Sequence, residues 1–272
     1  MGKMLFIIIM DQKNERSFLE EGKYMLIHHR IGDYSVAVYA PPTCLNGQKS
    51  APVLYVQDGD TLLPDGLESL GQQYREGQLP HLILVGIQPL NRLDEYSPWH
   101  SPALAEGRPA FGGKANRYLS FITGYVRPYI EARYPVMAGP RHTGIMGASL
   151  GGLVSMYAVY RHPEIFGHAA TLSGSYWYPG FVDFMQSETW TGYDGRYYMS
   201  VGSKEGEGKH TIQKDMLPLT IAAHDTLLQR GASSDRTHLE VIPDAVHGHE
   251  AFVKQFPSAV AWLLEGMNGQ VG

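Results

Sequence analysis

The chain has 272 residues, of which 43% are hydrophobic and 18% charged, a composition that supplies a sizeable core and excludes a disordered chain. Its formal net charge is -5, so a sequence-independent grip on nucleic-acid phosphates is not expected. The single cysteine, Cys44, cannot form an internal disulfide. In the turn-like stretch PPTCLNG we expect it to be an inert surface thiol.

The first segment of the chain carries a short apolar run, Leu5 to Met10, followed by charges from Asp11 to Arg16. The run is too short for a signal peptide, and no small-residue cleavage site precedes the charges. No stretch approaches the ~20 apolar residues that a membrane helix needs. We therefore expect a cytoplasmic protein without a membrane partner, whose residues 1–22 form a loose arm or a short strand.

Strand patterns come next along the chain. The segments 24–29 and 34–41 alternate apolar and polar residues around Gly32-Asp33, which predicts a β-hairpin. Residues 52–59 and 81–87 are continuous apolar runs that end in turn residues. Such runs are typical of strands covered on both faces in a parallel sheet. Between them, residues 65–78 can form a short helix.

Residues 116–135 place Leu119, Ile122, Tyr125 and Tyr129 at helical spacing, which predicts a helix that kinks or breaks at Pro128. From there strands and helices alternate. The expected strands are 143–146, 168–173, 197–201 and 238–242, and the expected helices are 151–161, 211–230 and 250–264. This alternation predicts a single α/β domain over residues 1–272, with a mostly parallel central sheet, helices on both faces and an antiparallel start.

One serine stands between a predicted strand and a predicted helix, in the motif Gly147-Ala148-Ser149-Leu150-Gly151. At such a turn the apex residue takes strained backbone angles, and small neighbours let strand and helix approach closely. The hydroxyl of Ser149 then projects above the carboxyl edge of the sheet, where parallel α/β folds bind ligands. The amide of Leu150 points to the same space and can bind a developing oxyanion. The context favours a nucleophile over a glycine-rich turn of no chemical importance.

A serine nucleophile requires a histidine base held by a carboxylate, in the chain order Ser, acid, His. The stretch VIPDAVHGHEAF, after the last expected strand, offers His247 and His249. The loop after the preceding strand offers Glu205 and Glu207 as acids. Three aspartates are further candidates, better explained as helix-surface or turn residues: Asp215, Asp225 and Asp244.

Several stretches resemble the esterase D-like branch of the α/β hydrolases: PVLYVQDGD, VGIQPLNRLDEYSPW, IMGASLGG, HPEIFGHAATLSGSYW, SVGSKEG and the final histidine loop. This branch includes ferric enterobactin and bacillibactin esterases, feruloyl and acetylxylan esterases, and mycolyltransferases. The resemblance runs from about Tyr34 onward and implies the α/β-hydrolase fold. It also implies that Ser149 is the nucleophile, that the amide of Asp60 joins that of Leu150 in the oxyanion hole, and that Glu205 is the acid.

The resemblance also separates the two loop histidines. The family's base is commonly followed by large apolar residues five and nine positions further on. Phe252 and Phe256 satisfy this spacing for His247, whereas a lysine and a serine would occupy it for His249. His247 is therefore the expected base.

The sequence offers few substrate contacts. Arg92 either binds an anionic group or pairs with Asp94. Four aromatic residues after the elbow helix form either an aromatic wall beside the serine, suited to aryl or catechol groups, or part of the core: Tyr176, Trp177, Tyr178 and Trp190.

Together these features predict a serine carboxyl-ester hydrolase that acts on a small-molecule ester, such as a siderophore trilactone, through an acyl-enzyme. Acyl transfer with the same residues is one alternative. A non-catalytic hydrolase-fold binding protein is another, and the full set of serine, acid and histidine argues against it. His-Gly-His alone is too little for a zinc site, so we expect neither a metal nor another cofactor.

Overall fold

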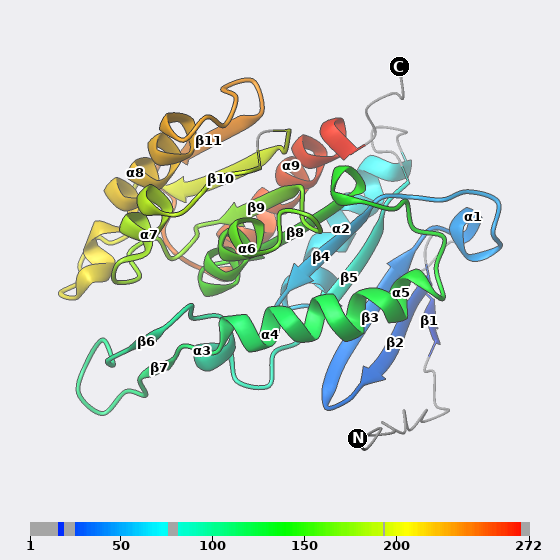
Figure 1. The fold of residues 1–272 in the computed structure, drawn as a ribbon, viewed down its shortest axis with the longest axis horizontal. Coiled ribbons are helices and arrows are strands. Elements are labelled where there is room, and N and C mark those ends of the chain that lie inside the picture. The colour runs from blue at the N-terminus through cyan, green and yellow to red at the C-terminus, as the bar shows by residue number, and fades with distance from the viewer. Residues whose placement is uncertain (1–15, 19–24, 76–80, 193, 268–272) are drawn as a thin grey trace.

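The structure, a computed structural model, describes residues 16–18, 25–75, 81–192 and 194–267. Its main sheet runs in the order β1-β2-β3-β5-β4-β8-β9-β10-β11 (Figure 1). The strands are β1 (Arg16–Phe18), β2 (Met25–Ile31), β3 (Tyr34–Ala40), β4 (Val53–Gln57), β5 (Ile83–Ile87), β8 (Thr143–Ala148), β9 (His168–Leu172), β10 (Tyr197–Gly202) and β11 (Thr237–Ile242), and a separate small ribbon holds β6 (His100–Ser101) and β7 (Phe111–Gly112).

The antiparallel start and the parallel body of the sheet are both confirmed. β1, β2, β3 and β5 pair antiparallel in that order, and each pairing from β5 across to β11 is parallel. The hairpin between β2 and β3 turns at Gly32, whose φ of +58° is a conformation that favours glycine. Every residue of β4 and β5 is buried, as expected for apolar strands with helices on both faces.

Helices cover the two faces of the sheet. The helical segments are α1 (Pro42–Leu45), α2 (Leu62–Arg75), α3 (Arg92–Glu95), α4 (Ala115–Phe121), a π-helical turn (Ile122–Val126), α5 (Arg127–Glu131), a 3₁₀ turn (Pro140–His142), α6 (Leu150–Arg161), α7 (Phe181–Ser187), a 3₁₀ turn (Ile212–Asp215), α8 (Met216–Gln229) and α9 (His249–Met267). α2 and α9 pack together on one face, whereas α4, α6 and α8 lie on the other (Figure 1). The α/β-hydrolase arrangement expected from the sequence is therefore the observed one.

The helix expected over residues 116–135 contains a π-helical turn just before Pro128. The N–H of Arg127 bonds the carbonyl of Ile122, five residues back. Such a turn adds a residue and rotates the following side chains about the helix axis. Val126 is therefore buried in the core, while Tyr125, expected on the apolar face, is 57% exposed.

Two expectations about the first part of the chain have different outcomes. Cys44 is buried in the hydrophobic core, so the prediction of a surface thiol is wrong; the segment forms the short helix α1, which packs inward. Of residues 1–22, Arg16–Phe18 form β1, and the others lie outside the described residues.

No helix in the described ranges is long and apolar enough to cross a membrane.

The first residue of β9, His168, is a buried histidine with a defined tautomer. Its Nδ1 accepts the backbone N–H of Arg196 at 3.0 Å, and its Nε2 lies 2.8 Å from the carbonyl oxygen of Arg141. The ring is therefore neutral, with the proton on Nε2. Burial lowers the pKa of His168 from 6.5 to about 4.

We expect the free energy of unfolding to fall as the pH is lowered from about 6.5 to about 4. In this range His168 is protonated in the unfolded chain and stays neutral in the folded protein, so protons favour the unfolded state. This one imidazole can change the free energy of unfolding by at most about 1.4 kcal/mol per pH unit. Urea unfolding across this range measures the trend, and the imidazole resonance of His168 in the folded protein isolates its source. A resonance that shifts near pH 6.5, as an exposed histidine does, would contradict the assignment.

Candidate active site

Ser149 lies at a strained turn between β8 and α6. Its φ of 56° and ψ of −121° confirm the strained backbone expected at the apex. The small neighbours are needed because β8 and α6 almost touch. A Cβ on Gly147 would lie 2.6 Å from the backbone carbonyl carbon of Gly151, closer than real Cβ atoms come. The turn thus holds the Ser149 side chain at the carboxyl edge of the sheet.

The structure brings three residues from the predicted set into one chain of hydrogen bonds. Ser149 Oγ lies 3.0 Å from His247 Nε2, and His247 Nδ1 lies 2.8 Å from Glu205 Oε2. Glu205 follows β10, His247 follows β11, and both loops lie at the same edge of the sheet as Ser149. The second loop histidine, His249, instead bonds the carboxylate of Asp65 on α2 at 2.6 Å.

The carboxylate of Glu205 is fully shielded from solvent and engages donors on both oxygens. Its Oε1 accepts the hydroxyl of Ser173 at 2.5 Å and the backbone N–H of Gly202 at 2.8 Å. Its Oε2 is left for His247 Nδ1, which must therefore carry a proton, because an ionised carboxylate only accepts. His247 Nε2 then presents a lone pair to the hydroxyl of Ser149, as a general base requires.

Ser173 was not singled out by the sequence analysis. It follows β9 directly and has a left-handed φ of 49°, like Asp58 after β4 with φ 54° and Ser149 after β8 with φ 56°. β4, β8 and β9 are neighbours in the sheet. Strained non-glycine residues cluster at functional sites, and these three lie side by side at one edge. A polar residue immediately after each parallel strand is the signal that could have found Ser173 and Asp58.

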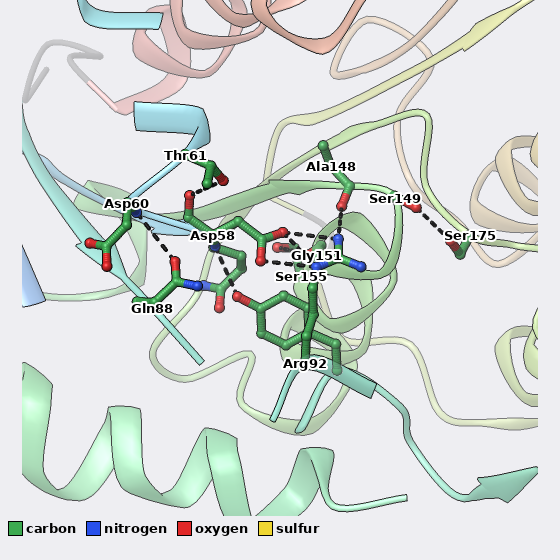
Figure 2. Close-up of polar contacts among 12 residues, drawn as sticks. Asp58, Asp60, Thr61, Gln88, Arg92, Ala148, Ser149, Gly151, Ser155 and Ser175 are labelled. Atoms are coloured by element: carbon green, nitrogen blue, oxygen red, sulfur yellow. Dashed lines mark hydrogen bonds and ion pairs between the residues drawn. The ribbon is translucent and has the colours of Figure 1, made fainter. Parts of the chain in front are cut away.

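Arg92 pairs with Asp58 rather than with Asp94 or a free anion. Its Nε and Nη2 lie 2.9 to 3.0 Å from the two carboxylate oxygens of Asp58, and Nη2 also donates to the carbonyl of Ala148 at 3.1 Å (Figure 2). Asp94 forms an ion pair with Lys114 at 2.6 Å. Of the two alternatives for Arg92, the pair with Asp94 is therefore wrong. Arg92 ties the end of β4 to the residue before Ser149.

The structure does not bring the Asp60 amide to Ser149. This N–H donates to the side-chain oxygen of Gln88 at 3.4 Å, and Figure 2 shows Asp60 and Ser149 on opposite sides of the cluster drawn around Asp58 and Arg92. The preceding residue, Gly59, packs against β5: a Cβ there would lie 2.4 Å from the backbone of Gly86, and its N–H donates to the carbonyl of Ile87 at 3.2 Å. The chain after β4 therefore turns toward β5, away from β8, and the predicted Asp60 donor is corrected.

Leu150 begins α6, so its amide has no acceptor within the helix. Its role as an oxyanion donor stays a prediction.

Of the two alternatives for the four aromatic residues after the elbow helix, an aromatic wall or part of the core, the structure shows the core. Each is at most 3% exposed: Tyr176, Trp177, Tyr178 and Trp190. The hydroxyl of Tyr176 lies 3.0 Å from that of Thr171, and Tyr178 donates to the carbonyl of Trp99 at 2.5 Å. An exposed aromatic wall with Tyr176 and Trp177 as substrate contacts is therefore corrected, because these rings pack inward.

No group of three or more potential metal ligands occurs within the part of the chain that the structure describes. A hydroxyl, an imidazole and a buried carboxylate in this order are the groups that can act as a nucleophile, a general base and the group that orients the base.

Comparison with known proteins gives one family. A sequence profile described as "Putative esterase" matches residues 30–263. The uncharacterized protein YbbA of Bacillus subtilis is 39% identical over 241 residues, which cover 89% of this chain and 96% of that protein. The siderophore enterobactin esterase of Emericella nidulans is 28% identical over 148 residues, 48% of each chain.

A similar fold occurs among solved structures. The IroE-like serine hydrolase of Shewanella oneidensis superposes with a TM-score of 0.74 at 20% identity, over 88% of this chain and 80% of that one. At this identity the likeness concerns the fold alone.

The two loop histidines form a matched pair for mutation. We expect His247→Ala to slow the reaction of Ser149 with a fluorophosphonate probe by about 10⁴-fold or more, as loss of a base in such a set does. His249→Ala removes only an exposed contact with Asp65 and should leave the labelling rate within a few fold. Labelling rates measured on both variants decide between them. The opposite ranking would transfer the base role to His249.

Proposed function

The chain belongs to the putative esterase family, and from that premise we propose that it cleaves carboxyl esters through an acyl-enzyme formed on Ser149. Its general activity is that of a carboxylic ester hydrolase. The single observation that supports the proposed mechanism is the chain of hydrogen bonds from Glu205 through His247 to Ser149.

In the proposed reaction, Ser149 Oγ attacks the ester carbonyl while His247 Nε2 takes its proton. The imidazolium is stabilised by the buried carboxylate of Glu205 and returns the proton to the departing alcohol. A water molecule then attacks the acyl-enzyme while His247 takes its proton, and the imidazolium returns that proton to Ser149 Oγ as the bond to the acyl carbon breaks and the carboxylic acid is released. Of the groups in this scheme, Ser149 Oγ and Glu205 Oε2 already lie within hydrogen-bond reach of His247.

We expect Ser149→Ala to abolish turnover of p-nitrophenyl esters while the protein keeps its wild-type thermal unfolding temperature. The hydroxyl is the bond-forming atom, whereas the fold depends on the backbone of this turn. Mass spectrometry after reaction with a fluorophosphonate should find one modified residue, Ser149. Ser155→Ala is the matched control, since its hydroxyl only bonds the carbonyl of Gly151 within α6. Equal turnover by wild type and Ser149→Ala would contradict the proposed mechanism.

A small-molecule ester is the proposed substrate class. The relatives named as siderophore esterases support a siderophore trilactone as one such ester. The charge around the site favours the uncomplexed ligand over its anionic ferric complex. Arg92 is already neutralised by the Asp58 carboxylate, and the exposed Asp60 adds negative charge on the neighbouring loop.

Turnover of a triscatecholate trilactone should therefore be faster in its iron-free form than as the ferric complex, which carries net negative charge that nothing at Arg92 offsets. Both rates are measured by chromatography of the released monomers at matched concentration. Added salt should narrow the difference, because it screens exposed charges. Faster cleavage of the ferric complex at every salt concentration would contradict this substrate assignment.

A further inference from the structure

The nucleophile has a second neighbour besides His247. Ser175 follows β9 by three residues, and its backbone N–H donates to the carbonyl of Ser149 at 3.0 Å. Its Oγ lies 3.3 Å from Ser149 Oγ (Figure 2). Ser175 is fully buried. Among the described residues, its hydroxyl makes this one hydrogen bond, so no other protein contact fixes the direction of its proton.

Counting protons along the site settles which serine donates. In the neutral imidazole that a general base requires, Nδ1 of His247 donates to Glu205 and Nε2 therefore accepts from Ser149. A hydroxyl has one proton, and Ser149 has given its own to that bond. The contact between the two serines is therefore a bond from Ser175 to Ser149 Oγ. Ser175 thus directs a buried donor at the reacting oxygen.

The acceptor for this donor changes during the reaction. Once Ser149 Oγ has attacked, it becomes an ester-type oxygen, and the negative charge collects on the former carbonyl oxygen bonded to the same carbon. The two oxygens are therefore adjacent, and a hydroxyl rotates freely about its C–O bond. The charged oxygen is the stronger acceptor, and burial removes competing water from the Ser175 donor.

We propose that Ser175 is a catalytic residue: its hydroxyl donates to Ser149 Oγ in the free enzyme and to the oxyanion in the tetrahedral intermediate. With the amide of Leu150 it supplies the second donor that Asp60 does not provide. Ser175 keeps its proton throughout, so no covalent bond forms or breaks at it. The proposal rests on the acyl-enzyme function proposed above.

The test compares Ser175→Ala with the wild type in two measurements. Loss of one oxyanion donor should lower kcat for a p-nitrophenyl ester by about 10² to 10³-fold, with KM nearly unchanged, because the bond strengthens only in the transition state. A phenylboronic acid forms a tetrahedral anionic adduct with an active serine, and its affinity should fall by a similar factor. Ser175→Cys, which keeps the side chain's shape but donates weakly, should show a loss of the same kind.

Ser155→Ala serves as the control for loss of a buried serine hydroxyl, and it should match wild type in both measurements. Wild-type kcat and wild-type boronate affinity in Ser175→Ala would overturn the proposal. A fall in kcat with unchanged boronate affinity would also overturn it, because the hydroxyl would then only orient Ser149. Boronate binding needs a reactive Ser149 but no turnover. Failure of the proposal for Ser175 can thus be told apart from failure of the ester-hydrolase mechanism. The latter would show as a wild-type protein that is inactive toward every ester.

Discussion

The buried carboxylate of Glu205 is the group on which the geometry of the site depends. A carboxylate shielded from water is costly unless donors compensate it, and here three donors do so, from Ser173, Gly202 and His247. These groups come from the ends of β9, β10 and the loop after β11. Compensation of one charge therefore fixes the relative positions of three neighbouring strand ends. It also fixes the imidazole tautomer that presents a lone pair to Ser149.

A second ionic contact does the same on the other side of the serine. Arg92 forms a bidentate ion pair with the carboxylate of Asp58 and donates a hydrogen bond to the carbonyl of Ala148. This joins the loop after β4, the short helix α3 and the last residue of β8. The ring of Tyr96 lies beneath the guanidinium, and its hydroxyl accepts the N–H of Asp58. Arg92 therefore acts in the framework of the site, with its charge paired to the carboxylate of Asp58.

The turn at Ser149 lies between these two contacts and keeps its strained backbone angles. The left-handed backbone at Asp58, Ser149 and Ser173 persists because each residue is fixed by side-chain or backbone partners at the carboxyl edge of the sheet. The side chain of His247 is 31% exposed whereas that of Glu205 is fully shielded. The imidazole is thus open to solvent, while the carboxylate that it contacts is not.

The sequence by itself determined the strand and helix periods, the elbow at Ser149 and the loops that bear Glu205 and His247, because these depend on local patterns. The spacing from His247 to Phe252 also has a physical basis: the two rings pack edge to face with their centroids 5.0 Å apart, and Phe252 and Phe256 lie on the buried face of α9. Only the tertiary structure decided which side chains meet across strands. Strand order and register place these groups together. They account for the contacts of Arg92 with Asp58, of Ser173 with Glu205 and of Ser175 with Ser149, and for the position of Asp60 next to the end of β5. Strand order and register arise from contacts between segments far apart in the chain, which no local pattern of residues specifies.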